Sequence, residues 1–209
     1  MPRIKYNIYL IIENFDGVFG RPTVDPPQGD SIRRDEHGKA LYDFGFLVIP
    51  EPFLEVSRYY PAYRFDAAYD KGRLWPIETH EIYNNGRPIS MSCHALVYLG
   101  ETADPKWAYK LLDDLTTVDE VRDLHEYARC AGEPWAIRIL NEFLHRGLIR
   151  DSDPAEVING SIILNTGILF LRSNPPSSGT ITCDVDGRPR CNPDWLDTNA
   201  HHQKVPKIK

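Results

Sequence analysis

Apolar residues near the N-terminus follow the two-residue period of a β-strand, and Tyr9 and Ile11 make the intervening positions apolar as well. The alternating positions are Ile4, Tyr6, Ile8, Leu10 and Ile12. A strand that is apolar on both faces is typical of the centre of a sheet. Residues 41–49 form a second apolar stretch, closed by Pro50 and Pro52, and predict a second strand.

Three turn motifs further along the chain predict β-hairpins. The first joins residues 78–83 to residues 89–99 through Asn-Asn-Gly. The second is a compact hairpin over residues 161–171, with Asn-Thr-Gly at its turn. The third covers residues 180–191 and turns at Asp-Gly, with a weaker alternation than the other two.

Helical periodicity begins after residue 104. Asp104 followed by Pro105 is a typical helix start, because Asp caps free N–H groups and proline fits the first helical position. The apolar stripe that follows is Trp107, Ala108, Leu111, Leu112 and Leu115. Thr117 and Glu120 have capping-box spacing and predict a second helix, which ends at Gly132.

A third helix is predicted from Pro134 to Gly147, with the clearest amphipathic stripe in the chain. Its apolar positions are Ala136, Ile139, Leu140, Phe143 and Leu144. Residues 153–156 predict one short further helical turn, which Asn159 and Gly160 stop.

The element order is strands, then helices, then strands. This order favours an α+β fold with an antiparallel or mixed sheet, built from the N-terminal strands and the C-terminal hairpins and packed against three to four central helices. No shift in composition marks a domain boundary. The sequence therefore predicts one domain over residues 1–200, followed by a basic tail at 201–209.

The composition narrows the function classes. The 209 residues carry 24 Lys and Arg against 30 Asp and Glu, a net charge of −6. Nucleic acid is therefore a poor partner, because phosphate contacts need clustered cations. The apolar runs are too short to span a membrane, and no signal peptide is recognisable, so we expect a cytoplasmic protein. No motif requires a cofactor, and the absence of familiar motifs suggests a viral or mobile-element origin.

The four cysteines are too few for a disulfide scaffold. Cys183 and Cys191 flank the Asp-Gly turn, so they could face each other across a hairpin, although free thiols are favoured in a reducing compartment. No Cys-x-x-Cys pair or helical histidine pair predicts a metal site. Residues 184–187 resemble the start of a calcium loop but lack its later carboxylates.

Cys93 and His94 are the most reactive-looking neighbours in the chain. A thiolate nucleophile needs a nearby base, but adjacent strand residues point to opposite faces, so the partner would be His80 on the paired strand. Arg64 and Asp66 complete the candidate set for an enzyme or small-molecule site. The alternative interpretation is a buried core cysteine beside a half-exposed histidine.

The segment Tyr63-Arg64-Phe65-Asp66, followed by Ser90-Met91-Ser92, is similar to the Arg and Ser-x-Ser elements of toxin-like ADP-ribosyltransferases. The resemblance implies NAD binding, and such enzymes orient the ribose with a glutamate in a Glu-x-Glu or Gln-x-Glu element. No such element follows Ser92, so the similarity is limited to two short motifs.

The sequence favours a non-enzymatic structural, assembly or partner-binding protein that acts as a homo-oligomer, with a second copy of itself or another protein as its partner. Its candidate contact residues are Tyr59, Tyr60, Tyr63 and Trp75, with Lys204, Lys207 and Lys209 of the tail. Aromatic residues are enriched at interfaces, although the core is their usual place. The basic tail of one copy could contact the acidic helix surface over residues 113–126 of another.

Overall fold

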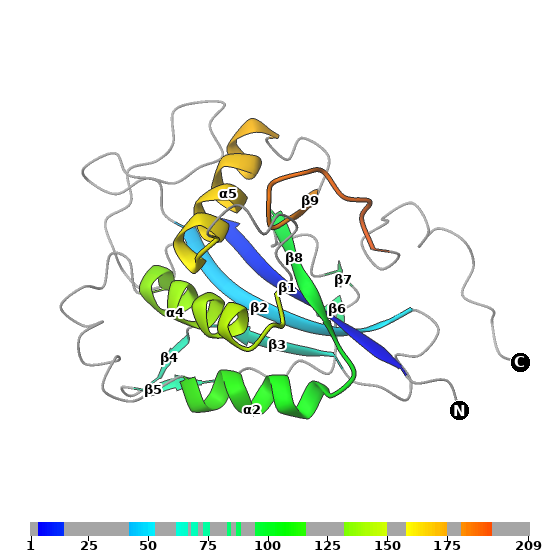
Figure 1. The fold of residues 1–209 in the computed structure, drawn as a ribbon, viewed down its shortest axis with the longest axis vertical. Helices are drawn as coiled ribbons and strands as arrows, with labels where there is room; N and C mark the ends of the chain where they lie inside the picture. The colour runs from blue at the N-terminus through cyan, green and yellow to red at the C-terminus, as the bar shows by residue number, and fades with distance from the viewer. Residues whose placement is uncertain are drawn as a thin grey trace, which may run out of the picture.

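The computed structural model describes residues 4–14, 42–52, 62–66, 68–70, 73–75, 83–84, 87–88, 95–115, 132–149, 158–174 and 181–193. These ranges form an α+β arrangement of a mixed five-stranded sheet and three helices (Figure 1). The fold class predicted from the element order is confirmed.

The main sheet has the strand order β3-β2-β1-β8-β9. Its strands are β1 (Lys5–Asn14), β2 (Tyr42–Glu51), β3 (Tyr63–Asp66), β8 (Ala95–Thr102) and β9 (Ile181–Asp184). Neighbours are antiparallel except β8 and β9, which run parallel. The doubly apolar pattern of β1 correctly predicted a central strand, and β2 continues through Pro50 to Glu51.

Two short antiparallel ladders accompany the sheet: β4 (Ala68–Asp70) with β5 (Arg73–Trp75), and β6 (Tyr83–Asn84) with β7 (Arg87–Pro88). The ladder of β6 and β7 confirms antiparallel pairing on the two sides of the predicted turn, whose residues 85 and 86 lie outside the described part of the chain. The predicted pairing of residues 95–99 with residues 78–83 was wrong, because residues 95–99 belong to β8, which pairs with β1 and β9. Leu96 is as buried as its neighbours Ala95 and Val97, which suits an interior strand.

The helices are α2 (Pro105–Leu115), α4 (Gly132–His145) and α5 (Gly160–Ser173). The cap of α2 forms as predicted, since the Trp107 amide donates to Asp104 Oδ1 at 3.2 Å. Helix α4 begins at Gly132 rather than at Pro134 and is followed by Gly147 in the left-handed region, at φ 69°. The predicted helices over 117–128 and 153–156 lie outside the described residues.

The predicted hairpin over residues 161–171 was wrong, because these residues form α5. Asn159 is its N-cap rather than a stop signal, and its side chain accepts from the Ile162 amide at 3.0 Å. The buried positions of α5 follow a helical period: Gly160, Ile163, Leu164, Gly167, Phe170 and Leu171. A nearly continuous apolar run hides that period from sequence inspection.

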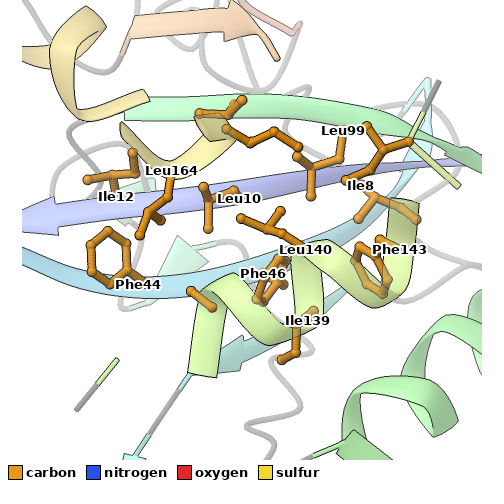
Figure 2. Close-up of a cluster of buried hydrophobic side chains, with 14 of the residues drawn as sticks. Ile8, Leu10, Ile12, Phe44, Phe46, Leu99, Ile139, Leu140, Phe143 and Leu164 are labelled. Carbon is orange, nitrogen blue, oxygen red and sulfur yellow. The ribbon is translucent and has the colours of Figure 1, made fainter. Parts of the chain in front are cut away.

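The main hydrophobic core lies between the sheet and the helices (Figure 2). It takes Tyr6, Ile8, Leu10 and Ile12 from β1, together with side chains of β2, β8, α2, α4 and α5. Helix α4 contacts β2 and α5, while α5 contacts β8 and β9. A Cβ added to Gly167 would lie 2.7 Å from side-chain atoms of both Ile12 and Val97, so α5 approaches the sheet closely at this glycine.

The other face of the same strands holds a smaller apolar cluster. It contains Tyr9, Ile11, Leu47, Ile49, Ala62 and Leu96, with Tyr98 packed against it. The sheet is therefore buried on both faces in its interior, as the pattern of β1 predicted.

Candidate functional site

The structure describes few of the candidate residues chosen from the sequence. Eight of them lie outside the described residues: His80, Cys93, His94, Tyr59, Tyr60, Lys204, Lys207 and Lys209. Of Asp66 and Trp75 only the backbone is described, in β3 and β5. The enzyme-type site that His80, Cys93 and His94 would form therefore stays a prediction, as does the NAD site suggested by the resemblance.

Arg64 and Tyr63 lie next to each other on β3 and point to opposite faces of the sheet. Tyr63 is half-buried and packs against the main core. Arg64 pairs with Leu47, whose side chain belongs to the smaller cluster. Within the aromatic stretch of residues 53–75, Phe65 is buried in the main core, so at least part of this stretch is structural.

A cavity of about 410 Å³ opens at the carboxyl ends of the parallel strands β8 and β9. Its walls come from three segments: the end of β8, the residues after α4, and the turn after β9. The lining residues are Tyr98, Leu99, Gly100, Glu101, Gly147, Leu148, Asp184, Val185, Asp186 and Arg188. Ligands of sheets with parallel strands commonly bind beyond the carboxyl ends of those strands.

The turn after β9 forms one wall of the cavity. The Gly187 amide donates to the Asp184 carbonyl, and Gly187 has φ 80°, which explains a glycine at this position. Asp186 Oδ1 accepts from the Arg188 amide at 3.1 Å, which further fixes the turn. An antiparallel bridge between Cys183 and Pro189 confirms the predicted hairpin over residues 180–191.

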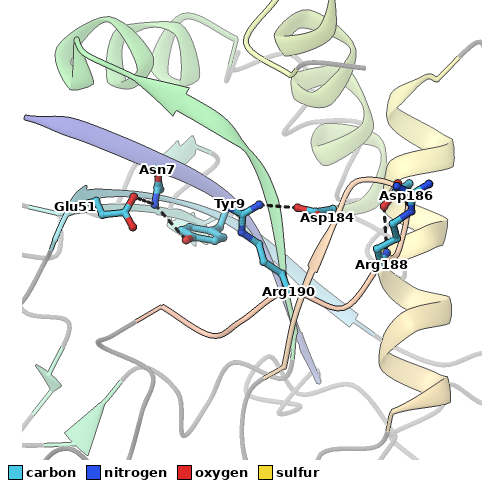
Figure 3. A network of polar contacts seen from close by, with 7 residues as sticks. All are labelled: Asn7, Tyr9, Glu51, Asp184, Asp186, Arg188 and Arg190. Atoms are coloured by element: carbon cyan, nitrogen blue, oxygen red, sulfur yellow. Dashed lines mark hydrogen bonds and ion pairs between the residues drawn. The ribbon is translucent and has the colours of Figure 1, made fainter. Parts of the chain in front are cut away.

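Two ion pairs flank this turn (Figure 3). Arg190 Nη1 lies 2.8 Å from Asp184 Oδ1, and Arg188 Nε lies 3.1 Å from Asp186 Oδ2. A third pair, Lys5 with Glu101 at 2.8 Å, lies at the rim beside β8. The cavity therefore displays both signs of charge on a short stretch of chain.

Arg190 also reaches across the sheet face opposite the helices. Its guanidinium carbon lies 3.8 Å from the ring centroid of Tyr98, a cation–π contact. The Tyr98 ring meets the Tyr9 ring edge to face at 5.6 Å. Behind them the Asn7 amide donates to Glu51 Oε2 at 2.6 Å and to the Tyr9 hydroxyl at 3.4 Å (Figure 3).

Burial shifts the ionisation of this network. Desolvation raises the pKa of Tyr9 and of Tyr98, so both phenols stay protonated at neutral pH. Burial alone would lower the pKa of Arg190, but the hydrogen bond and charge of Asp184 raise it above its usual value. The arrangement therefore presents a permanent cation and neutral phenols.

Cys183 and Cys191 are both free, the first buried and the second exposed, so the alternative of a bridge between them is not formed. Burial raises the pKa of the Cys183 thiol to about 12, with smaller contributions from Asp184 and Asp186. A thiol held protonated in this way is a core residue and a poor nucleophile.

Helix α5 carries a second surface of interest on its outer side. Ile162 and Leu169 are the large apolar side chains that stay exposed among the described residues, at 45% and 60%. Asn165 lies between them, and Arg172 continues the line one turn further. This outer stripe of α5, Ile162–Asn165–Leu169–Arg172, has no counterpart among the residues chosen from sequence, because the segment was read as a hairpin.

The cavity residues were also missed. The sequence placed Asp184 and Asp186 in a turn and compared them only with a calcium loop. No group of three or more metal-binding side chains is present in the described part of the chain. The alternation of acidic and basic residues from Asp184 to Arg190 was the signal available in the sequence. The other walls of the cavity come from β8 and from the segment after α4, so this signal covers only one wall.

No protein-family model, curated protein or solved structure matches this chain. None of the helices that the structure describes is long and apolar enough to cross a membrane.

Proposed function

We propose that the protein is a non-enzymatic assembly protein that associates with a second copy of itself through the outer stripe of α5. The observation that carries the proposal is a partly apolar helix face on the surface, charged only at its C-terminal end. From Gly160 to Leu171 the helix contains no charged residue. Surface helices ordinarily present charged side chains to water, so this face has the composition of a contact surface.

The spacing within the stripe suits helix pairing. Ile162, Asn165, Leu169 and Arg172 are separated by three, four and three residues, the spacing of a two-helix seam. In an antiparallel pair about a twofold axis, Ile162 would lie opposite Leu169 of the second copy, with the axis near Asn165. A polar residue at such a central position fixes register at some cost in affinity.

The charge distribution is compatible with a second copy as the occupant. Two chains of net charge −6 repel each other, so a self-contact must avoid acidic surface. The outer stripe meets this condition, because its one charged member, Arg172, lies at its end and is directed toward the Tyr42 hydroxyl at 3.3 Å. A single pair of 14-residue helices buries less area than a standard interface, so the association is expected to depend on concentration.

The test is sedimentation velocity of the full chain over a wide concentration range. The wild type should shift from monomer to dimer as concentration rises, and Leu169→Glu should remain monomeric. Lys110→Glu places the same carboxylate on the exposed side of α2 and should dimerise like the wild type. A wild type that is monomeric throughout, or a Leu169→Glu variant that still dimerises, would exclude this interface.

The tail offers a separate route to assembly. If the basic residues 201–209 bind the acidic surface of another copy, deleting them should shift the protein toward monomer even with α5 intact. A dimer that survives this deletion but not Leu169→Glu assigns the contact to α5.

A further inference from the structure

The cavity beside β8 has an unpaired strand edge as part of its wall. Strand β9 accompanies β8 only from Ala95 to Tyr98, whereas β8 continues to Thr102. On that side, residues 99–101 have no strand partner within the described part of the chain. A Cβ on Gly100 would collide with the Leu148 carbonyl, so the chain after α4 lies against part of this edge. A ligand that offers amide or carboxylate partners would use the backbone groups that remain.

The remaining walls combine apolar contact with polar groups. Leu99, Leu148 and Val185 contribute apolar side chains to the lining. The Tyr98 hydroxyl makes no hydrogen bond to any described residue and is kept protonated by its surroundings. The cavity is open to solvent on one side, and its volume of about 410 Å³ falls in the range of small-molecule sites.

A positive and a negative side chain of the cavity each have atoms without a hydrogen-bond partner among the described residues. Arg188 uses only its Nε and its backbone amide on Asp186, so both terminal nitrogens are without a partner among the described residues. Asp184 gives Oδ1 to Arg190, and its Oδ2 accepts no hydrogen bond from the residues the structure describes. The cavity thus offers one cationic donor pair and one anionic acceptor.

The presence of both positive and negative groups in the cavity disfavours a ligand that carries only one charge. A simple anion would approach Arg188 but would meet the carboxylates of Asp184, Asp186 and Glu101. A simple cation would approach Asp184 but would meet the guanidinium groups of Arg188 and Arg190. We propose that the cavity binds a small zwitterion, a free amino acid or dipeptide with an apolar side chain.

In this arrangement the ligand carboxylate pairs with the Arg188 fork and its ammonium group pairs with Asp184 Oδ2. The apolar side chain packs on Leu148 and Val185, and the peptide group of a dipeptide lies along the edge of β8. Each charged contact favours the zwitterion over analogues that lack the matching group, because the charge-assisted hydrogen bonds to that group are then lost.

The experiment is saturation-transfer NMR followed by calorimetric titration on the full chain. The probes are L-leucine and glycyl-L-leucine, with isoamylamine and 4-methylpentanoate as analogues that keep the side chain but only one charge. At least one zwitterion should bind to the protein. Each singly charged analogue should bind to the protein about tenfold more weakly than that zwitterion, or worse.

Variants locate the site. Arg188→Gln and Asp184→Asn should each lower the affinity for the zwitterion by about tenfold or more. Lys106→Gln and Asp114→Asn remove the same charges from exposed positions on α2 and should bind like the wild type. Folding of each variant is checked by its thermal transition, and Arg188 is 79% exposed, so its replacement should not unfold the chain.

Three results would overturn the proposal. These are the absence of saturation transfer from both zwitterions, equal binding of a zwitterion and its singly charged analogue, and unchanged binding in Arg188→Gln. All three readouts are independent of the self-association of α5, because they measure ligand signals at a fixed protein concentration.

Discussion

The two faces of the sheet are made by the same strands but have different chemistry. On the face covered by α4 and α5, the alternate residues of β1 from Tyr6 to Ile12 all enter the main core. On the opposite face, Tyr9 and Ile11 are apolar neighbours, but Asn7 and Lys5 follow toward the strand's beginning and engage Glu51 and Glu101.

The polar end of the second face borders the cavity, whose apolar walls Leu99, Leu148 and Val185 belong to the main core on the other face. Asn7 of β1 pairs with Glu101 of β8, and Tyr9 pairs with Tyr98, so the polar residues of β1 lie beside the cavity-lining end of β8. The helix-covered face stabilises the fold and also supplies the apolar walls of the cavity. A face on which burial stops partway can combine a rigid apolar platform with charged side chains at its end.

The largest expected effect is on the helix-covered face. Phe46 is fully buried, and its ring packs edge to face on Trp135 and Phe143 at 5.4 and 5.6 Å. Phe46→Ala should lower the free energy of unfolding by about 3–5 kcal/mol, because it removes apolar contact and leaves a cavity. Urea denaturation measures the loss, and a loss below about 1 kcal/mol would contradict close packing here.

The next effect tests how closely α5 approaches the sheet. Gly167→Ala inserts a methyl group 2.7 Å from Ile12 Cδ1 and Val97 Cγ2, so these side chains must move. The expected loss is about 1–3 kcal/mol in the free energy of unfolding, despite the better helix propensity of alanine. Asn165→Ala, on the exposed side of the same helix, should change stability little. Equal effects at both positions would place α5 further from the sheet.

The elements of the fold were predictable from sequence to different degrees. The period of β1 and the stripes of α2 and α4 are strongly amphipathic or doubly apolar, and each element was found. Helix α5 was misread because its β-branched residues and Asn-Thr-Gly motif favour a hairpin locally. Its packing on α4 at Gly160 and on the sheet at Gly167 overrides that local preference.

The candidate site was less predictable than the fold for a physical reason. The turn from Asp184 to Arg188 is local, and its hairpin was identified from sequence. Its neighbours Tyr98 and Leu148 become part of one cavity only through the parallel register of β8 and β9 and the chain path after α4. That register depends on the helical crossover, which includes the segment that was misread.

A pH series separates the two faces by their buried titratable groups. Burial raises the pKa of Cys183 on the helix-covered face to about 12, against 9.0 for a free thiol. Its contribution to stability is therefore complete below pH 9 and is lost as pH rises toward 12, because only the unfolded chain releases the proton readily. The loss amounts to about 1.4 kcal/mol per pH unit above pH 9.

The measurement is the free energy of unfolding between pH 8 and 10.5 for the wild type and Cys183→Ala. The variant should be less stable at pH 8 but should lose stability less steeply above pH 9. Cys191→Ala, at the exposed cysteine, is the matched control and should follow the wild-type slope. Tyr9 and Tyr98 on the other face supply the alkaline dependence that remains in Cys183→Ala. Parallel curves for the wild type and Cys183→Ala would show that this thiol titrates normally.

The smallest effect is expected where the second face becomes polar. Arg190 is partly exposed, pairs with Asp184 and lies over Tyr98. Arg190→Gln should cost only about 0.5–1.5 kcal/mol in the free energy of unfolding, because water screens the ion pair and the cation–π contact is modest. Thermal and urea unfolding measure it, with Arg188→Gln as a control that should cost less. A loss as large as that of Phe46→Ala would make this network a structural element. A small loss leaves the polar end of the face available for recognition, since its residues can then change without unfolding the sheet.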